Sequence, residues 1–126
     1  MIRPLLIIRP VLAVLLALAL PIHTASAHPR LLHAAPAAGS HVTGAPREIS
    51  LSFNEAVSVA LSRLTLLDSA KRAVTLDSLR PAPRDGKTFT AKVRGALRPG
   101  RYTVKWQAGG ADGHPMRGEY TFTVDG

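Results

Sequence analysis

Apolar and polar residues alternate one by one along much of this chain. The alternation is regular in four segments, residues 48–54, 88–94, 101–107 and 120–124. A period of two places successive side chains on opposite faces of an extended chain, and a single apolar face is typical of half-buried antiparallel strands. These segments therefore predict four strands whose apolar sides face a common core.

Weaker strands are predicted at residues 30–33, 61–67 and 73–78. Residues 57–67 fit a helix about as well as a strand, and the strand pattern around them favours the strand. Turn signals rich in glycine, proline and aspartate separate the segments. About seven or more antiparallel strands at such short intervals indicate an all-β fold, a β-sandwich or small Greek-key barrel.

Two aromatic residues in the third regular segment are predicted to be structural. Residues 97–102 resemble the tyrosine corner of β-sandwiches, in which a tyrosine hydroxyl bonds to the backbone a few residues upstream. We therefore expect Tyr102 to brace this corner. Trp106 faces the same side of the strand, so we expect it in the core and not on a binding surface.

The start of the chain has the features of a secretory signal. Arg3 and Arg9 give the first residues of the chain a positive charge, and residues 11–20 form an unbroken apolar run. The run is too short for a membrane span, which needs about 20 apolar residues. Ala25-Ser26-Ala27 has the small-x-small form of a signal-peptidase site. We expect cleavage after Ala27, with an uncleaved signal anchor as the alternative.

Cleavage predicts a single exported domain, residues 28–126, with His28 as its first residue. Removing residues 1–27 from 126 leaves 99, enough for one small domain. The chain has no cysteine, which excludes disulfides and thiolate metal sites.

The predicted mature chain is basic. Without the two signal arginines, the 16 Lys and Arg fall to 14 against 8 Asp and Glu, a net charge of +6. The basic residues occur in no run longer than two, so we expect a solvated sheet surface and no nucleic-acid partner. The sequence after residue 27 contains no second apolar run that would predict a membrane span.

The candidate chemistry centres on His28, Asp112 and His114. Asp112 and His114 are two residues apart, so in an extended backbone both side chains point the same way. An N-terminal His28 offers its α-amine and its ring nitrogen to one metal ion, while Pro29 has no N–H and blocks coordination through successive backbone amides. Three nitrogens and one carboxylate oxygen suit tetragonal Cu(II). Spacing alone leaves open a simple inter-strand loop with a turn aspartate.

The remaining mature histidines, His33 and His41, lie in no ligand-spaced motif. We expect them to be surface or hydrogen-bonded residues and leave open whether they contribute to metal binding.

An ordered set of motifs covers nearly all of the mature chain: residues 28–32, 35–40, 46–57, 99–106, 112–115 and 118–124. Taken together, these motifs resemble the CopC family of exported copper-resistance proteins. It implies a cupredoxin-like or immunoglobulin-like Greek-key fold and one Cu(II) per chain, bound by His28, Asp112 and His114. Glu55 matches the family's acidic residue near the copper and is expected as an outer or weak axial partner.

The resemblance also implies a role and a location. We expect a periplasmic, monomeric, non-catalytic protein that sequesters copper or hands it to an inner-membrane transporter of the CopD type. Some members of the family carry a methionine-rich Cu(I) loop, but residues 67–83 contain no methionine and Met116 is the only one after the initiator. We therefore expect no Cu(I) site.

Two other functions remain as alternatives. A copper oxidase or monooxygenase with an N-terminal histidine brace uses a similar start, although it needs an open copper position that Asp112 is expected to fill. A metal-free β-sandwich interaction module shares the fold, and a fold alone does not determine function.

Overall fold

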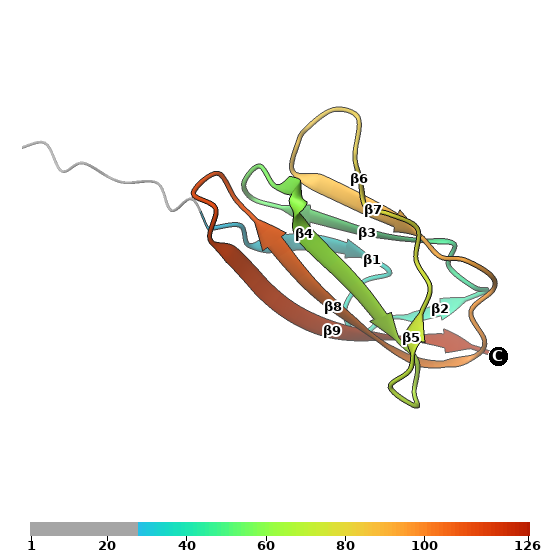
Figure 1. Ribbon diagram of the computed structural model, residues 1–126. Helices are drawn as coiled ribbons and strands as arrows, with labels where there is room; N and C mark the ends of the chain where they lie inside the picture. Colours follow the sequence, from blue (N-terminus) through green and yellow to red (C-terminus); the bar gives the residue numbers. More distant parts are fainter. Residues whose placement is uncertain (1–27) are drawn as a thin grey trace, which may run out of the picture.

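The computed structural model describes residues 28–126, so the predicted signal at residues 1–27 lies outside the described residues. Figure 1 shows the described chain as two β-sheets packed face to face. Its nine strands are β1 Leu31–Ala35, β2 His41–Thr43, β3 Glu48–Phe53, β4 Ser58–Leu67, β5 Ala73–Val74, β6 Arg80–Pro81, β7 Thr88–Lys92, β8 Gly100–Gly109 and β9 Pro115–Asp125.

The strands are divided between a four-stranded sheet of order β1-β3-β7-β6 and a five-stranded sheet of order β2-β9-β8-β4-β5. Every pair is antiparallel except β2–β9, which is parallel. The prediction of an all-β Greek-key sandwich is confirmed, with this one parallel pair as the exception to its antiparallel strands. Across residues 28–126 no helix is long and apolar enough to cross a membrane.

The core lies between the sheets and is made by the predicted apolar faces. Ile49, Leu51, Phe89, Val104 and Phe122 are each at most 1% exposed. The register of β3 on β7 sets Leu51 beside Phe89, and both side chains point inward. Burying a side chain of this size contributes about 1.5–3 kcal/mol, so these positions hold the two sheets together.

The two aromatic predictions are also confirmed. The Tyr102 hydroxyl donates a hydrogen bond of 2.7 Å to the carbonyl oxygen of Arg98, as expected for a tyrosine corner. Trp106 packs against the core and meets the ring of Phe53 edge-on, with centroids 5.2 Å apart. A Cβ at Gly118 would collide with the indole, so the absence of a side chain at this position makes room for Trp106.

Some strand bounds differ from prediction. The segment predicted at 73–78 pairs only as β5 and through a bridge from Leu76 to Val93. The last strand begins at Pro115, before its regular alternation, because β8 pairs with it along its full length. Strands β2 and β6 were not predicted, since two or three residues are too few to show a period.

One end of the sandwich gathers three segments that are distant in sequence. Figure 1 shows the start of β1, the β3–β4 loop and the β8–β9 loop at the same end. The start of β1 and the β3–β4 loop are joined directly, because Asn54 donates its N–H to the carbonyl oxygen of Arg30 over 3.1 Å. The candidate site residues all lie on these segments.

Candidate metal centre

His28 is held in place by the two residues that follow it. Pro29 is among the most completely buried side chains of the described chain. The N–H of Arg30 donates a short hydrogen bond of 2.6 Å to Asn54 Oδ1 at the end of β3. A buried ring and a backbone clamp therefore fix the chain next to His28, while its own side chain stays half exposed.

The β8–β9 loop presents Asp112 and His114 through a tight turn. The N–H of Gly113 donates to the carbonyl oxygen of Gly110 over 3.0 Å, and Gly113 has φ +76°, a left-handed conformation that glycine adopts without strain. The N–H of His114 donates to Asp112 Oδ1 over 3.0 Å. The expectation of an extended backbone here is wrong: an aspartate turn, in which the side chain captures a backbone N–H two residues on, brings the two side chains together.

The structure brings the three predicted ligands into one cluster. His28 Nδ1 lies 3.6 Å from Asp112 Oδ2, and His114 Nδ1 lies 3.5 Å from the same oxygen. The two imidazole rings are stacked with centroids 6.2 Å apart. Two nitrogen donors thus flank one carboxylate oxygen at the solvent-facing edge of the sandwich.

Asp112 is kept in its ionised form. The hydrogen bond from the His114 N–H is the largest influence that lowers the pKa of Asp112, and the neighbouring charges of His28 and His114 lower it further. Partial desolvation opposes these effects without reversing the direction. The carboxylate is therefore available as an anionic ligand over a wide pH range.

The cluster is open. Within residues 28–126 no three histidine, cysteine or carboxylate side chains are close enough to form a ready-made metal cage. The three side chains here are close in pairs, but the histidines stand on either side of Asp112 and both are at least half exposed. In the 126-residue chain the backbone nitrogen of His28 belongs to a peptide bond, so an amine donor arises only when the chain begins at His28.

The donor chemistry of the cluster fits Cu(II). Two imidazoles and a carboxylate are the nitrogen and oxygen ligands that Cu(II) accepts in tetragonal geometry, and no sulfur donor is needed. An α-amine at His28 would supply the fourth position. Both histidine side chains are at least half exposed and neither belongs to the core.

Other predicted residues lie outside the cluster. Glu55 is half-buried in the β3–β4 loop, next to Asn54, and no ion pair of the described part of the chain joins it to the cluster. His33 lies on β1 opposite Ser52. His41 Nδ1 lies 2.9 Å from Asp125 Oδ1, at the β2 edge of the larger sheet. These positions match the surface or hydrogen-bonded roles expected of the two histidines.

Sequence reasoning missed the residues that support the β8–β9 loop at its base. Strand β4 bulges between Ser58 and Arg63. The Ser62 hydroxyl donates a hydrogen bond of 2.6 Å to the carbonyl oxygen of Ser58. It also accepts a hydrogen bond of 3.2 Å from the N–H of Gly109. A Cβ at Gly109 would lie 2.9 Å from the carbonyl oxygen of Leu61, so only glycine fits. The conspicuous signal in the sequence was Gly109 itself, just before the loop.

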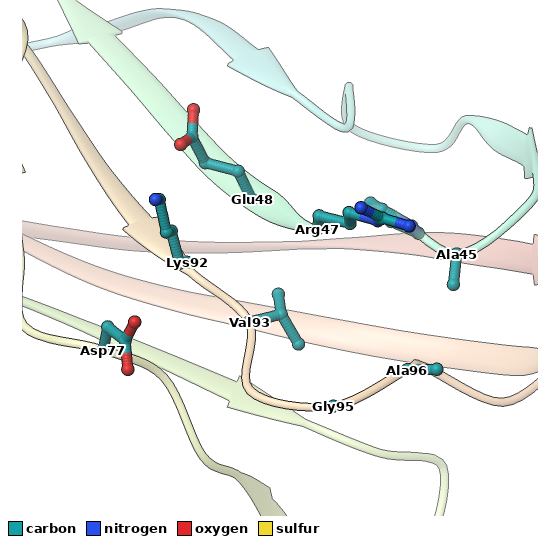
Figure 2. Close-up of a pocket in the computed structure, with 9 residues that line it drawn as sticks. Ala45, Arg47, Glu48, Asp77, Lys92, Val93, Gly95 and Ala96 are labelled. Carbon is teal, nitrogen blue, oxygen red and sulfur yellow. The ribbon is translucent and has the colours of Figure 1, made fainter.

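A hollow at the end of the sandwich opposite the His28–Asp112–His114 cluster is lined by charged residues and no histidine. Figure 2 shows Arg47, Glu48, Asp77 and Lys92 around a depression of about 650 Å³. Glu48 lies opposite Lys92 on paired strands, and Asp77 is ion-paired with Arg94. Because Asp77 is paired with Arg94, two further cations line the hollow and no histidine does, this hollow is a poor metal site.

The family, sequence and structure comparisons with known proteins agree with one another. Residues 31–125 match the model of the CopC domain family. The chain is 37% identical over 107 residues to copper resistance protein C of Escherichia coli, covering 80% of this chain and 84% of that protein. Among solved structures, CopC from Methylosinus trichosporium OB3b is similar with a TM-score of 0.72 and 33% identity, covering 78% of this chain and 94% of that one. PcoC, a methionine-rich copper resistance protein from Escherichia coli, is similar with a TM-score of 0.71 and 36% identity, covering 79% and 100%.

Proposed function

The chain belongs to the CopC family, and from this premise we propose that it is an extracytoplasmic copper-binding protein of copper resistance or homeostasis. The proposed active form is periplasmic and monomeric, begins at His28 and carries one Cu(II). The observation that carries the proposal is the convergence of His28 and His114 on one oxygen of Asp112.

In this proposal each residue has a defined role toward the copper cargo. His28 supplies its α-amine and a ring nitrogen, His114 supplies the second imidazole, and Asp112 supplies a carboxylate that also offsets the charge of the ion. Glu55 acts from outside as a weak axial or hydrogen-bonding partner. The side chains of all three ligands are exposed to solvent, which suits a protein that accepts and releases its metal, and a membrane transporter of the CopD type is the proposed recipient.

The proposal is tested by titrating Cu(II) into protein that begins at His28. Trp106 is the only tryptophan and lies on β8, the strand that leads into the metal loop, so its fluorescence reports binding. We expect quenching that saturates at one equivalent and no comparable response to Zn(II) or Mg(II). Several weak equivalents, or no saturation, would contradict a single built site.

The enzyme alternative is tested separately. A histidine-brace oxidase needs a copper position free for oxygen, whereas Asp112 lies 3.6 Å from His28. We therefore expect no reductant-driven oxygen consumption above that of the same amount of Cu(II) bound to free histidine. Sustained turnover by the loaded protein would favour the oxidase.

A further inference from the structure

The solvent-facing side of the five-stranded sheet is strongly basic. Because Tyr102, Val104 and Phe122 point into the core, the residues between them on β8 and β9 point outward. The basic face is defined here by its exposed basic residues, which come from β4, the turn after it, β8 and β9: Arg63, Lys71, Arg101, Lys105 and Arg117.

The pairings on this side support one continuous face. Arg63, Gln107 and Arg117 lie in one row across β4, β8 and β9, and Arg117 Nε donates to Gln107 Oε1 over 3.1 Å. Lys71 lines a shallow depression together with Lys105 on the same surface. Neighbouring strands are about 4.8 Å apart, so these cations are spread over a broad area of the sheet.

Few carboxylates neutralise the basic face. Glu119 is outward-facing on β9 and lies 3.9 Å from Lys105, at the limit of an ion pair. Asp125, at the far end of β9, is in contact with His41, whose Nδ1 lies 2.9 Å from Asp125 Oδ1. Among residues 28–126, Arg63, Lys71, Arg101 and Arg117 have no carboxylate within ion-pair distance. Five cations against two carboxylates leave this face with a net charge of +3.

The outward side of the other sheet is less basic and its charges are closer to one another. The outward residues of β3 and β7 are mainly hydroxyls, such as Ser52 and Thr88, which hydrogen-bond to each other over 2.8 Å. Its charged residues include Glu48 directly opposite Lys92, seen together in Figure 2, with Arg80 on β6. With Arg47 just before β3, these four residues carry a net charge of +2, compared with +3 on the basic face.

We propose that the basic face docks the protein on an anionic phospholipid membrane surface. A broad group of five cations, four of them without an ion-pair partner, complements a surface of many phosphate headgroups, and it lacks the groove-following strip that nucleic acid requires. Such attraction acts within about one Debye length, about 10 Å at 0.1 M salt, so it is reversible and salt-sensitive. The predicted export of the chain places it in a compartment bounded by membranes.

Docking in this orientation has a geometric consequence. Arg117 follows His114 by three residues, and the β8–β9 loop is at one end of the same sheet. A protein lying on its basic face keeps that loop at the edge of the membrane surface and open to solvent. The docking itself follows from charge and does not depend on copper.

The test uses protein beginning at His28 and sedimentation with two kinds of vesicle, phosphatidylcholine alone and phosphatidylcholine mixed with phosphatidylglycerol. We expect binding only to the mixed vesicles and its loss at high salt. The triple variant Arg63→Gln, Lys105→Gln, Arg117→Gln should bind about a hundredfold more weakly, since each basic residue near an anionic surface contributes about a fivefold factor.

A matched triple variant, Arg47→Gln, Arg80→Gln, Lys92→Gln, removes the same charge from the other side and should keep most of the binding. Circular dichroism and copper-induced quenching of Trp106 verify that both variants fold. Equal losses in the two variants would mean that only net charge matters and would overturn the proposal. So would equal binding to both vesicle types, or tighter binding to a short DNA duplex than to the mixed vesicles.

Discussion

His28 and Asp112 connect the two sheets at one end of the sandwich, with His28 Nδ1 lying 3.6 Å from Asp112 Oδ2. His28 leads into β1 of the four-stranded sheet, whereas Asp112 lies between β8 and β9 of the five-stranded sheet. A metal ion held by both residues therefore links the sheets as well as the side chains.

This link predicts that Cu(II) stabilises the fold. A ligand that binds only the folded state adds RT ln(1 + [L]/Kd), about 2.7 kcal/mol when its free concentration is a hundred times Kd. We expect the unfolding midpoint of protein beginning at His28 to rise with Cu(II), measured by denaturant titration of Trp106 fluorescence. Asp112→Asn should show a much smaller rise. An equal rise in both would place the copper away from this cluster.

Substitution of the individual histidines should separate ligands from surface residues. His114→Ala removes an imidazole and should weaken Cu(II) binding by more than about tenfold, because even outer partners of a metal site contribute that much. The controls His33→Ala and His41→Ala should change affinity little, as their side chains lie outside the cluster. Isothermal titration measures all three, and similar losses at each position would indicate adventitious surface binding.

Acid and reduction should both release the metal. Protons compete with the metal for the two imidazoles and the amine, which bind copper only in their deprotonated forms. The pKa of Asp112 is lowered, so its carboxylate protonates only at stronger acidity and is not the first ligand lost. Cu(I) prefers sulfur, and Met116 is the only thioether after the initiator. Ascorbate with a Cu(I) chelator should therefore strip the protein. Retention of Cu(I), with a sulfur signal in X-ray absorption, would contradict this ligand set.

From the burial of Tyr120 we predict a loss of folding stability at high pH that does not involve copper. Burial raises the pKa of its hydroxyl to about 12 from 10.0, and in the described chain this buried oxygen has no hydrogen-bond partner. Its folded-state pKa is the higher one, so its contribution to stability is intact below pH 10 and is lost as pH rises towards 12.

The variant Tyr120→Phe removes both effects. Its free energy of unfolding at neutral pH should be equal to or up to about 1 kcal/mol above that of the parent chain, since an unsatisfied hydroxyl is lost. The difference between the two proteins should widen in favour of Tyr120→Phe between pH 10 and 12, because lysine titration is common to both. Denaturant titrations across this range measure it, and a marked loss at neutral pH would reveal a hydrogen bond to this hydroxyl.

The fold was predictable where side-chain alternation reports burial directly. Ile49, Leu51 and Phe89 alternate with polar residues because one face of each strand meets the core, and the structure buries these three. The parallel pairing of β2 with β9 was not predictable, because three residues carry no period and their partner is distant in sequence. The start of β9 was missed because Pro115 and Gly118 are poor strand formers that pair through the neighbouring β8.

The candidate site was predictable in its residues and less so in its construction. The residue types of Asp112 and His114 suggest metal chemistry, but the aspartate turn that joins them depends on a backbone hydrogen bond. The position of His28 depends on burial of Pro29 and on the clamp from Arg30 to Asn54. Such long-range contacts leave no local pattern, so the sequence indicated the ligand residues and not the contacts that position them.

The central claim is that copper is bound by the N-terminal amine of His28 together with its ring, His114 and Asp112. The most direct measurement is the Cu(II) electron paramagnetic resonance spectrum of protein beginning at His28, compared with the same protein carrying one added alanine before it. We predict a tetragonal spectrum with hyperfine coupling to three nitrogens, and loss of one nitrogen with much weaker binding when the alanine is present. Identical spectra and affinities for the two proteins would contradict the account, because the amine would then not be a ligand.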